Sequence, residues 1–331
     1  MTTTKAGRAA VWRALQAAHD MAQAMKHADW IKVERVPQPV PTHGQVHNSR
    51  SFPYAKQRIK HGASVSGTEV AAMPDKQDPP PVTAVNEGGP SPYVLLCEHA
   101  SNHIPAEYAG LGLQGPDLRR HIAWDIGAAD LARLLSRQLD APLFLSGYSR
   151  LLIDCNRPLL TPTSIPTRSE DTEIPGNHGL TVDERESRAA AYFTPFHDRV
   201  AATLDRRARA ATSTIVVGVH SFTPVFRGVA RPWQCGVLYA AAAGFGQALI
   251  ARLAADPRLN VGDNQPYQIA AAEDYTVPVH GDQRGLPAAL IEVRQDLLAT
   301  PEGIKEWAQR LAPALAGIAA GFLATSRPTG C

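Results

Sequence analysis

The sequence predicts an α/β domain built on a largely parallel sheet. From residue 93 onward, short apolar runs rich in Val, Ile and Leu alternate with segments of helical periodicity, as in sheets whose strands are buried on both faces. Several of these runs end in His, Asp, Asn or Glu. Open α/β sheets carry their sites at the carboxyl ends of strands, so these polar side chains are candidates for function.

Six apolar runs are predicted as strands, at residues 93–97, 143–146, 151–154, 215–219, 235–239 and 288–293. Helical spacing predicts helices over residues 129–139, 182–204, 245–256 and 301–325. The last segment keeps the helical period with Ile304, Trp307, Leu311, Leu315 and Ile318. One face of that helix is therefore expected to pack against the sheet.

The first 90 residues differ from the rest. Residues 9–26 have helical spacing, but the stretch that follows is rich in Pro, Gly, Ser and Lys, with prolines clustered at 37–41 and 79–81. Such a composition buries too little apolar surface to offset the chain entropy lost on folding. We expect a disordered or loosely attached N-terminal extension at residues 1–90 and a folded domain at residues 91–331.

Composition argues against several kinds of partner. The 331 residues are 44% hydrophobic and 19% charged with a net charge of +2, which gives no reason to expect nucleic acid or an anionic membrane as partner. No secretory signal or membrane-spanning run is evident, so we expect a cytoplasmic protein. The four cysteines form no C-x-x-C pair, which favours free thiols. The sequence does not indicate an oligomeric state.

Two histidines follow predicted strands directly. His99 comes two residues after the run 93–97, and His220 comes immediately after the run 215–219. A polar turn would account for either histidine alone, because a lone His is more often a satisfied core or surface residue. Two rigidly held imidazoles with one carboxylate, however, are what a hydrolytic zinc centre requires, since they leave a coordination position open.

Asp125 allows two interpretations. It precedes a predicted helix and could cap it. Its apolar neighbours Ile122, Trp124 and Ile126 also indicate a carboxylate held near the interior, where it needs a metal or an arginine for compensation. Both interpretations stay open.

A second polar group surrounds the run 151–154. Arg150 and Arg157 bracket this run, and Asn156 lies at its exit. A guanidinium beside an amide suits a substrate carboxylate, because guanidinium groups bind both carboxylate oxygens. The alternative is an ion pair between Asp154 and one of the two arginines that only shapes the loop, and both can hold together.

Glu292 lies inside the apolar run 288–293. An unpaired carboxylate is costly there. It either pairs with Arg294, which shares its face of the strand, or acts as a general base beside a metal.

Four separated segments, in order, resemble the N-formylglutamate amidohydrolase family over residues 93–320: residues 97–102 with Pro105, 125–127, 149–158 and 220–222. That family is related in fold to the zinc carboxypeptidases. Residues 154–157 are similar to their substrate-carboxylate motif, and residues 291–294 to the strand that carries their general base. Asn102 stands where their H-x-x-E motif has the glutamate, so the carboxylate ligand is assigned to Asp125, with Glu98 as the alternate.

The resemblance implies a phosphorylase/hydrolase-like three-layer sandwich with a central mixed, mostly parallel sheet. It also implies metal-dependent hydrolysis of a small-molecule N-acyl amino acid, first of all N-formyl-L-glutamate, to formate and glutamate in histidine degradation. The implied metal is zinc or another divalent ion. The implied residues are His99, Asp125 and His220 as metal ligands, Glu292 as general base, and Asn102, Arg150, Asn156 and Arg157 as substrate contacts. Alternatives are a zinc amidase for another acylated or cell-wall peptide, and a non-catalytic relative that binds an acidic ligand.

Overall fold

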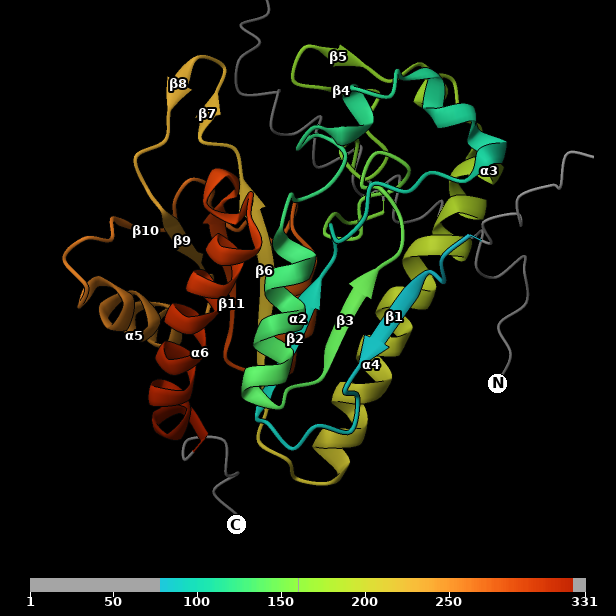
Figure 1. Ribbon diagram of the computed structural model, residues 1–331. Helices are drawn as coiled ribbons and strands as arrows, with labels where there is room; N and C mark the ends of the chain where they lie inside the picture. Colours follow the sequence, from blue (N-terminus) through green and yellow to red (C-terminus); the bar gives the residue numbers. More distant parts are fainter. Residues whose placement is uncertain (1–77, 160, 324–331) are drawn as a thin grey trace, which may run out of the picture. The chain divides into compact units, whose positions relative to one another are not determined.

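A computed structural model describes residues 78–159 and 161–323, and the unit that they form begins at Asp78. Its central sheet has seven strands (Figure 1) in the order β1 (Val82–Val85), β3 (Leu143–Ser146), β2 (Tyr93–Cys97), β6 (Ile215–Phe222), β11 (Ala288–Arg294), β9 (Cys235–Leu238) and β10 (Val261–Asp263). β1 is antiparallel to β3 and β9 is antiparallel to β11, whereas the other neighbours are parallel. The predicted mixed, mostly parallel sheet is confirmed.

Helices cover both faces of the sheet, which confirms the three-layer architecture. One face carries α2 (Ala128–Leu139), α5 (Ala243–Ala254) and α6 (Pro301–Leu323), and the other carries α4 (Thr194–Arg209). Alternate residues of β2 serve the two cores, since Leu95 packs on the α2 side and Leu96 on the α4 side. This alternation explains why the whole strand is apolar.

Short elements connect the layers. They are α3 (Val182–Arg188), the π-helical turns η4 (Ala189–Phe193) and η5 (Thr276–Gly281), and the 3₁₀ segments η1 (Ala106–Gly112), η2 (Asp117–Arg119), η3 (Pro175–Asn177), η6 (Asp282–Arg284) and η7 (Gln295–Leu298). Two small hairpins complete the set, β4 (Arg168–Ser169) with β5 (Thr172–Glu173) and β7 (Val225–Phe226) with β8 (Val229–Ala230). Within the described ranges, no helix has the length and apolar character needed to cross a membrane.

Three features differ from the sequence prediction. The predicted strand at 151–154 is wrong: these residues are buried, but they turn, with Leu152 N–H donating to Ser149 O. The predicted helix at 182–204 is divided into α3, η4 and α4. Strand β1, which the sequence analysis did not predict within the first 90 residues, pairs with β3. The helix predicted at 9–26 lies outside the described residues.

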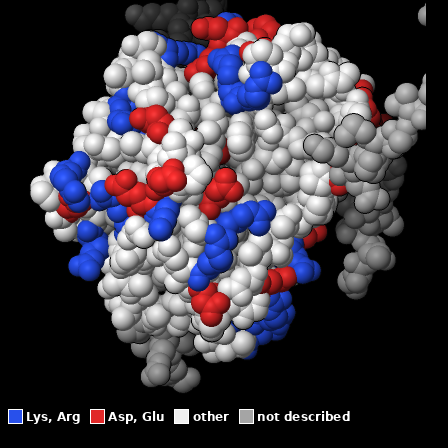
Figure 2. Space-filling view, in the orientation of Figure 1, with Lys and Arg blue, Asp and Glu red and all other residues white. Residues whose placement is uncertain are grey.

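The connections between strands reverse direction along the sheet at β2, because the strands that follow it in sequence, β3 and β6, lie on opposite sides of it. The chain leaves β2 through α2 to β3 on one side, then returns through α4 on the opposite face to β6 on the other side of β2. In open α/β sheets the crevice at such a switch point, outside the carboxyl ends of the strands, receives the ligand. On the molecular face in Figure 2, acidic and basic side chains are interspersed.

Candidate active site

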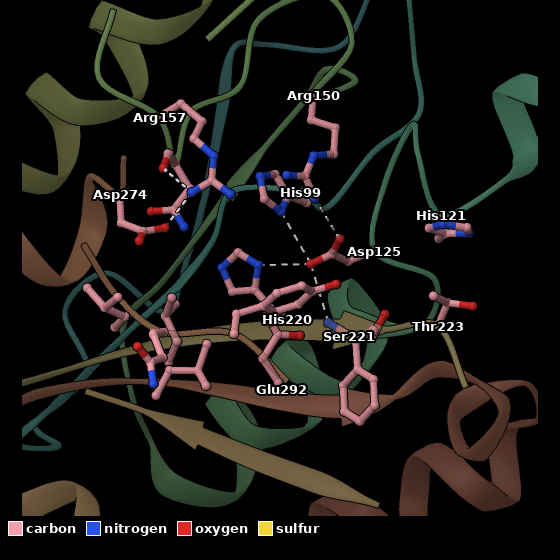
Figure 3. A pocket seen from close by; sticks show the side chains of 17 residues that line it. His99, His121, Asp125, Arg150, Arg157, His220, Ser221, Thr223, Asp274 and Glu292 are labelled. Atoms are coloured by element: carbon pink, nitrogen blue, oxygen red, sulfur yellow. Dashed lines mark hydrogen bonds and ion pairs between the residues drawn. The ribbon is translucent and has the colours of Figure 1, made fainter. Parts of the chain in front are cut away.

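A pocket of about 670 Å³, measured to its open mouth, lies at the carboxyl ends of β2 and β6. Figure 3 shows the side chains that line it. They include the predicted residues His99, Asp125, Arg150, Asn156, Arg157, His220 and Glu292. Asn102 is the only predicted site residue that is not among the lining residues.

Both histidines point the same ring nitrogen at one carboxylate oxygen. Asp125 Oδ2 lies 3.3 Å from His99 Nδ1 and 2.8 Å from His220 Nδ1. The two rings are nearly perpendicular, with centroids 4.8 Å apart, and the three potential ligand atoms lie within 4.8 Å of one another. The structure therefore brings together the three side chains that the sequence analysis singled out as a metal site (Figure 3).

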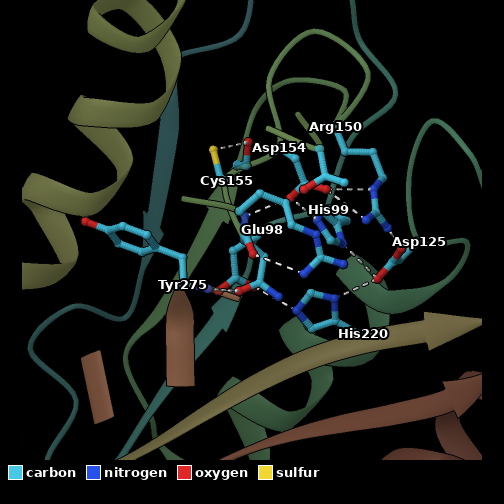
Figure 4. Close-up of polar contacts among 12 residues, drawn as sticks. Glu98, His99, Asp125, Arg150, Asp154, Cys155, His220 and Tyr275 are labelled. Carbon is cyan, nitrogen blue, oxygen red and sulfur yellow. Dashed lines mark hydrogen bonds and ion pairs between the residues drawn. The ribbon is translucent and has the colours of Figure 1, made fainter. Parts of the chain in front are cut away.

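A buried carboxylate stands behind each imidazole (Figure 4). His99 Nε2 is 2.7 Å from Asp154 Oδ1, and His220 Nε2 is 2.9 Å from Glu98 Oε2. With a cation bound, each Nε2–H would donate to its carboxylate, and the Nδ1 lone pairs beside Asp125 would bind the cation. Metal-binding histidines are oriented in this way. Glu98 thus lies behind the His220 ring, and the geometry favours Asp125 over Glu98 as the carboxylate ligand.

Backbone contacts from the turn after β2 and from strand β6 hold Asp125. Its N–H donates to His99 O at 3.0 Å, and its Oδ2 accepts from Ser221 N–H at 3.3 Å. The helix-cap interpretation is wrong, because Gly127 is the N-cap of α2. Gly127 has φ +79°, and a Cβ at this position would lie 2.5 Å from Leu298 Cβ, so the turn that presents Asp125 requires glycine.

Charge compensation sets the protonation of this cluster. Burial raises the pKa of Asp125, but His99 and His220 outweigh it and hold that pKa below its usual range. Burial lowers the pKa of His220, yet its bonds to Asp125 and Glu98 raise it well above the ordinary value. A divalent cation competes with the proton for the Nδ1 lone pair. Two imidazole nitrogens and one carboxylate oxygen fit zinc or a similar divalent ion.

Glu292 stands beside His220 in the sheet. The two residues are partners in the register of β11 and β6, so their side chains emerge on the same face. Glu292 is 6% exposed, and its Oε2 has no hydrogen-bond partner in the described part of the chain. Burial raises the pKa of Glu292 to about 7, which suits a group that takes and returns a proton near neutrality.

Arg294 does not neutralise Glu292. Its Nε donates to Asp296 Oδ1 at 2.8 Å, so the alternative of a Glu292–Arg294 pair is wrong. The carboxylate of Glu292 faces the pocket instead.

Asn156 and Arg157 keep hydrogen-bond donors available. Asn156 Oδ1 accepts from the N–H groups of Tyr275 and Thr276, while Nδ2 has no partner among the described residues. Arg157 contacts the Asp274 carboxylate and Glu273 O through Nη1. In the described ranges Nε and Nη2 of Arg157 have no hydrogen bond, so this pair presents several N–H donors at the pocket wall.

Arg150 and Asn102 are engaged by the protein itself. Arg150 Nη2 is 2.8 Å from Asp154 Oδ2, and Arg150 Nη1 is 3.5 Å from Asp125 Oδ1. The predicted Asp154–Arg150 ion pair is therefore present. Asn102 Nδ2 donates to Leu118 O at 2.8 Å, which fixes the loop after β2, and Asn102 does not line the pocket.

Sequence reasoning missed the wall formed by residues 264–276. This segment supplies Tyr267, Gln268, Ile269 and Asp274 to the pocket, and the Thr276 hydroxyl donates to Glu98 Oε1. It crosses the sheet at Gly236, the register partner of Glu292, where a Cβ would lie 1.8 Å from Gln265 O. The path of this segment depends on the close approach of Gln265 to Gly236, and no pattern in the sequence predicts that approach.

The chain is similar to known proteins in sequence and in fold. The model of the N-formylglutamate amidohydrolase family matches residues 91–299. A solved structure of a gene product from Agrobacterium tumefaciens is 36% identical, with a TM-score of 0.69 over 73% of this chain and 97% of its own. The N-formylglutamate amidohydrolase from Ralstonia eutropha is 18% identical and shares the fold, with a TM-score of 0.55 over 73% of this chain and 98% of its own. No curated protein sequence matches the chain.

Proposed function

The chain belongs to the N-formylglutamate amidohydrolase family, and from this premise we propose that it hydrolyses the amide bond of an N-acyl amino acid at a divalent metal ion. The proposed ligands are His99, Asp125 and His220. N-formyl-L-glutamate is the first candidate substrate, with formate and glutamate as products. The proposed catalytic domain is the predicted domain at residues 91–331 together with the preceding strand β1, which pairs with β3, and the cytoplasm is its proposed location.

One observation carries the proposal. The Nδ1 atoms of His99 and His220 converge on one oxygen of Asp125, and each Nε2 is backed by a buried carboxylate. This arrangement orients two lone pairs toward one point and fixes the tautomer of both rings. A cluster of ion pairs with only a structural role does not require both imidazole rings to direct Nδ1 at the same carboxylate oxygen.

The residues divide the chemistry among them. A divalent cation, when bound, lowers the pKa of a water and polarises the acyl oxygen. Glu292 takes the proton of the attacking water and returns it to the leaving nitrogen as the C–N bond breaks. Arg157 and Asn156 bind a substrate carboxylate through their free N–H groups, which orients the amide. Arg150 holds Asp154 and Asp125 in place.

Metal analysis combined with a substrate screen tests the proposal. Purified protein is expected to contain close to one equivalent of zinc or another divalent metal and to release formate from N-formyl-L-glutamate. N-acetyl and N-carbamoyl amino acids and acylated cell-wall peptides complete the screen. His220→Ala should lose both metal and turnover. His178→Ala is the matched control, because His178 is 54% exposed and pairs with Glu173 away from the pocket.

The outcomes separate the candidate functions. Cleavage of acylated peptides without cleavage of N-acyl amino acids would establish the amidase alternative instead. Protein that purifies without metal, binds none on titration and cleaves nothing would be a non-catalytic relative. Retention of metal and activity in His220→Ala would contradict the assigned centre.

A further inference from the structure

Arg231 is a buried guanidinium without a carboxylate partner. It follows β8 and is 9% exposed. Its Nη1 donates to Tyr267 Oη at 3.0 Å and to Thr223 O at 3.4 Å. The guanidinium carbon lies 4.7, 4.9 and 5.8 Å from the ring centroids of Phe226, Tyr267 and Phe222. Across residues 78–159 and 161–323, no Asp or Glu forms an ion pair with it.

The other arginines at the pocket are compensated. Arg150 is bound by Asp154 and Asp125, and Arg157 is bound by Asp274. A cation that is buried away from water needs an opposing charge, or other favourable contacts, to offset the hydration that it has lost. Three aromatic faces supply part of this for Arg231 through cation–π attraction. Its positive charge nevertheless remains available to an anion that enters from outside.

Contacts of Arg231 reach the pocket wall. Phe222, Thr223 and Tyr267 all line the pocket, and each of them touches Arg231. Tyr267 is 43% exposed, and its oxygen accepts a hydrogen bond from the guanidinium. The Tyr267 O–H is therefore free to donate to another group, and a ligand in the pocket that Tyr267 lines could accept this hydrogen bond. In the described residues, Nε and Nη2 of Arg231 have no hydrogen bond and are not fully enclosed.

A dicarboxylate needs a second cationic contact in this pocket. Asp125, Asp274 and Glu292 already line it, so a substrate with two negative charges meets repulsion unless each charge is matched. Arg157 with Asn156 serves one carboxylate. The Arg150 guanidinium is shared between Asp154 and Asp125 and cannot serve the other in full.

We infer that Tyr267 and Arg231 form the subsite for the side-chain carboxylate of an acidic N-acyl amino acid. Tyr267 Oη–H donates to the carboxylate, and Arg231 is a positioning residue that fixes the hydroxyl and supplies the compensating charge through it. This inference rests on the proposed function and adds the residues that would recognise the side-chain carboxylate of its first candidate substrate. It also assigns specificity to a tyrosine on the segment 264–276 and an arginine on the β7–β8 hairpin.

Two substrates of equal shape test the subsite. N-formyl-L-glutamate carries the side-chain charge, whereas N-formyl-L-glutamine does not. Arg231→Met should lower kcat/KM for the glutamate derivative roughly 10- to 100-fold, the range for one charge-assisted hydrogen bond, and leave that for the glutamine derivative nearly unchanged. Arg227→Met is the matched control, since Arg227 is exposed on the same hairpin and, among the described residues, its guanidinium stacks on Phe226 alone.

A second variant separates specificity from folding. Tyr267→Phe removes only the hydroxyl of a partly exposed side chain and should reduce the preference for glutamate over glutamine in the same direction, with an unchanged melting temperature. Equal losses on both substrates, or an unchanged preference in both variants, would overturn the inference.

Binding of glutarate by calorimetry distinguishes this failure from failure of the proposed function. If the wild type hydrolyses neither substrate but binds glutarate more tightly than Arg231→Met does, the subsite stands and the reaction is wrong. If the wild type hydrolyses N-formyl-L-glutamate and both proteins bind glutarate equally, the reaction stands and the subsite is wrong.

Discussion

Glu292 and His220 are register partners on the neighbouring parallel strands β11 and β6. Because the pleat sends both side chains to the same face, the sheet itself sets the carboxylate beside the imidazole. Loop movement has little effect on their separation. The proposed base and one proposed ligand are thus held by the most rigid part of the molecule.

Glu292→Gln tests the base directly. The amide keeps the shape but takes no proton, so kcat is expected to fall roughly 100- to 10,000-fold, while metal content stays near that of the wild type. Turnover with N-formyl-L-glutamate and elemental analysis of the same preparation give the two readouts. An active Glu292→Gln enzyme would remove this residue from the mechanism.

Thr276→Val tests the chain of contacts behind His220. The Thr276 hydroxyl donates to Glu98, which in turn accepts from His220 Nε2. Loss of such a supporting hydrogen bond weakens metal binding by roughly 10- to 100-fold, which competition with a chelator measures. Thr276→Ser keeps the hydroxyl and should bind metal like the wild type. Equal affinity in Val and Ser variants would mean that Glu98 needs no such support.

His197 and His280 predict a pH dependence of stability. His197 Nε2 donates to Cys155 O, so its Nδ1 accepts from His280 Nε2–H at 2.9 Å, and the buried His280 Nδ1 is left without a partner. Burial lowers the pKa of His197 to about 3 and that of His280 to about 4. The unfolded chain therefore takes up protons below about pH 6.5 that the folded chain refuses, and stability falls as the pH falls from 6.5 toward 4.

Urea unfolding at a series of pH values measures this effect. In His197→Gln the free energy of unfolding should vary less steeply between pH 6 and pH 4.5, by up to about 1.4 kcal/mol per pH unit for the histidine removed. His178→Gln, at the exposed histidine used as a control above, should keep the wild-type slope. Parallel curves for all three proteins would show that His197 takes up a proton as readily in the folded state as in the unfolded state.

Gly236→Ala tests the loop path. A Cβ at this position would lie 1.8 Å from Gln265 O, so the segment that carries Tyr267 must shift away from the sheet. We expect a loss of about 1–3 kcal/mol in stability and a rise in KM larger than the fall in kcat. Gly88→Ala is the control, since a Cβ there meets nothing within 4 Å. Wild-type KM in Gly236→Ala would show that the segment does not need this crossing.

The sequence predicted features that are set by local burial. Each strand that is buried on both faces appears as an apolar run, and His99 and His220 were found because each follows such a run. The same reasoning failed at residues 151–154, where an equally apolar run packs as a turn against the α4-side core. Apolar character predicts burial, but it does not distinguish a strand from a buried turn.

Features that depend on the path of a loop were not predictable. Thr276 and Asp274 contact partners more than a hundred residues away in the sequence. Tyr267 lines the pocket. The local sequence around these three residues has no pattern that predicts such contacts. Asn102 shows the converse, because its place in a motif suggested a substrate contact while the loop turns its amide to Leu118. Arg231 was missed because no charge pattern signals a cation that lacks a partner.

The proposed reacting groups and the groups that would select the substrate lie on different parts of the fold, and this affects how substrate preference can change. The proposed reacting groups sit at the ends of β2, β6 and β11 or in the turn before α2, whereas the groups that would choose the substrate lie on residues 264–276 and the β7–β8 hairpin. Transplanting those two segments between homologous enzymes should exchange their preferences and leave the reaction itself intact. The scaffold is thus suited to acquiring new amide substrates by insertion, deletion or replacement of surface loops.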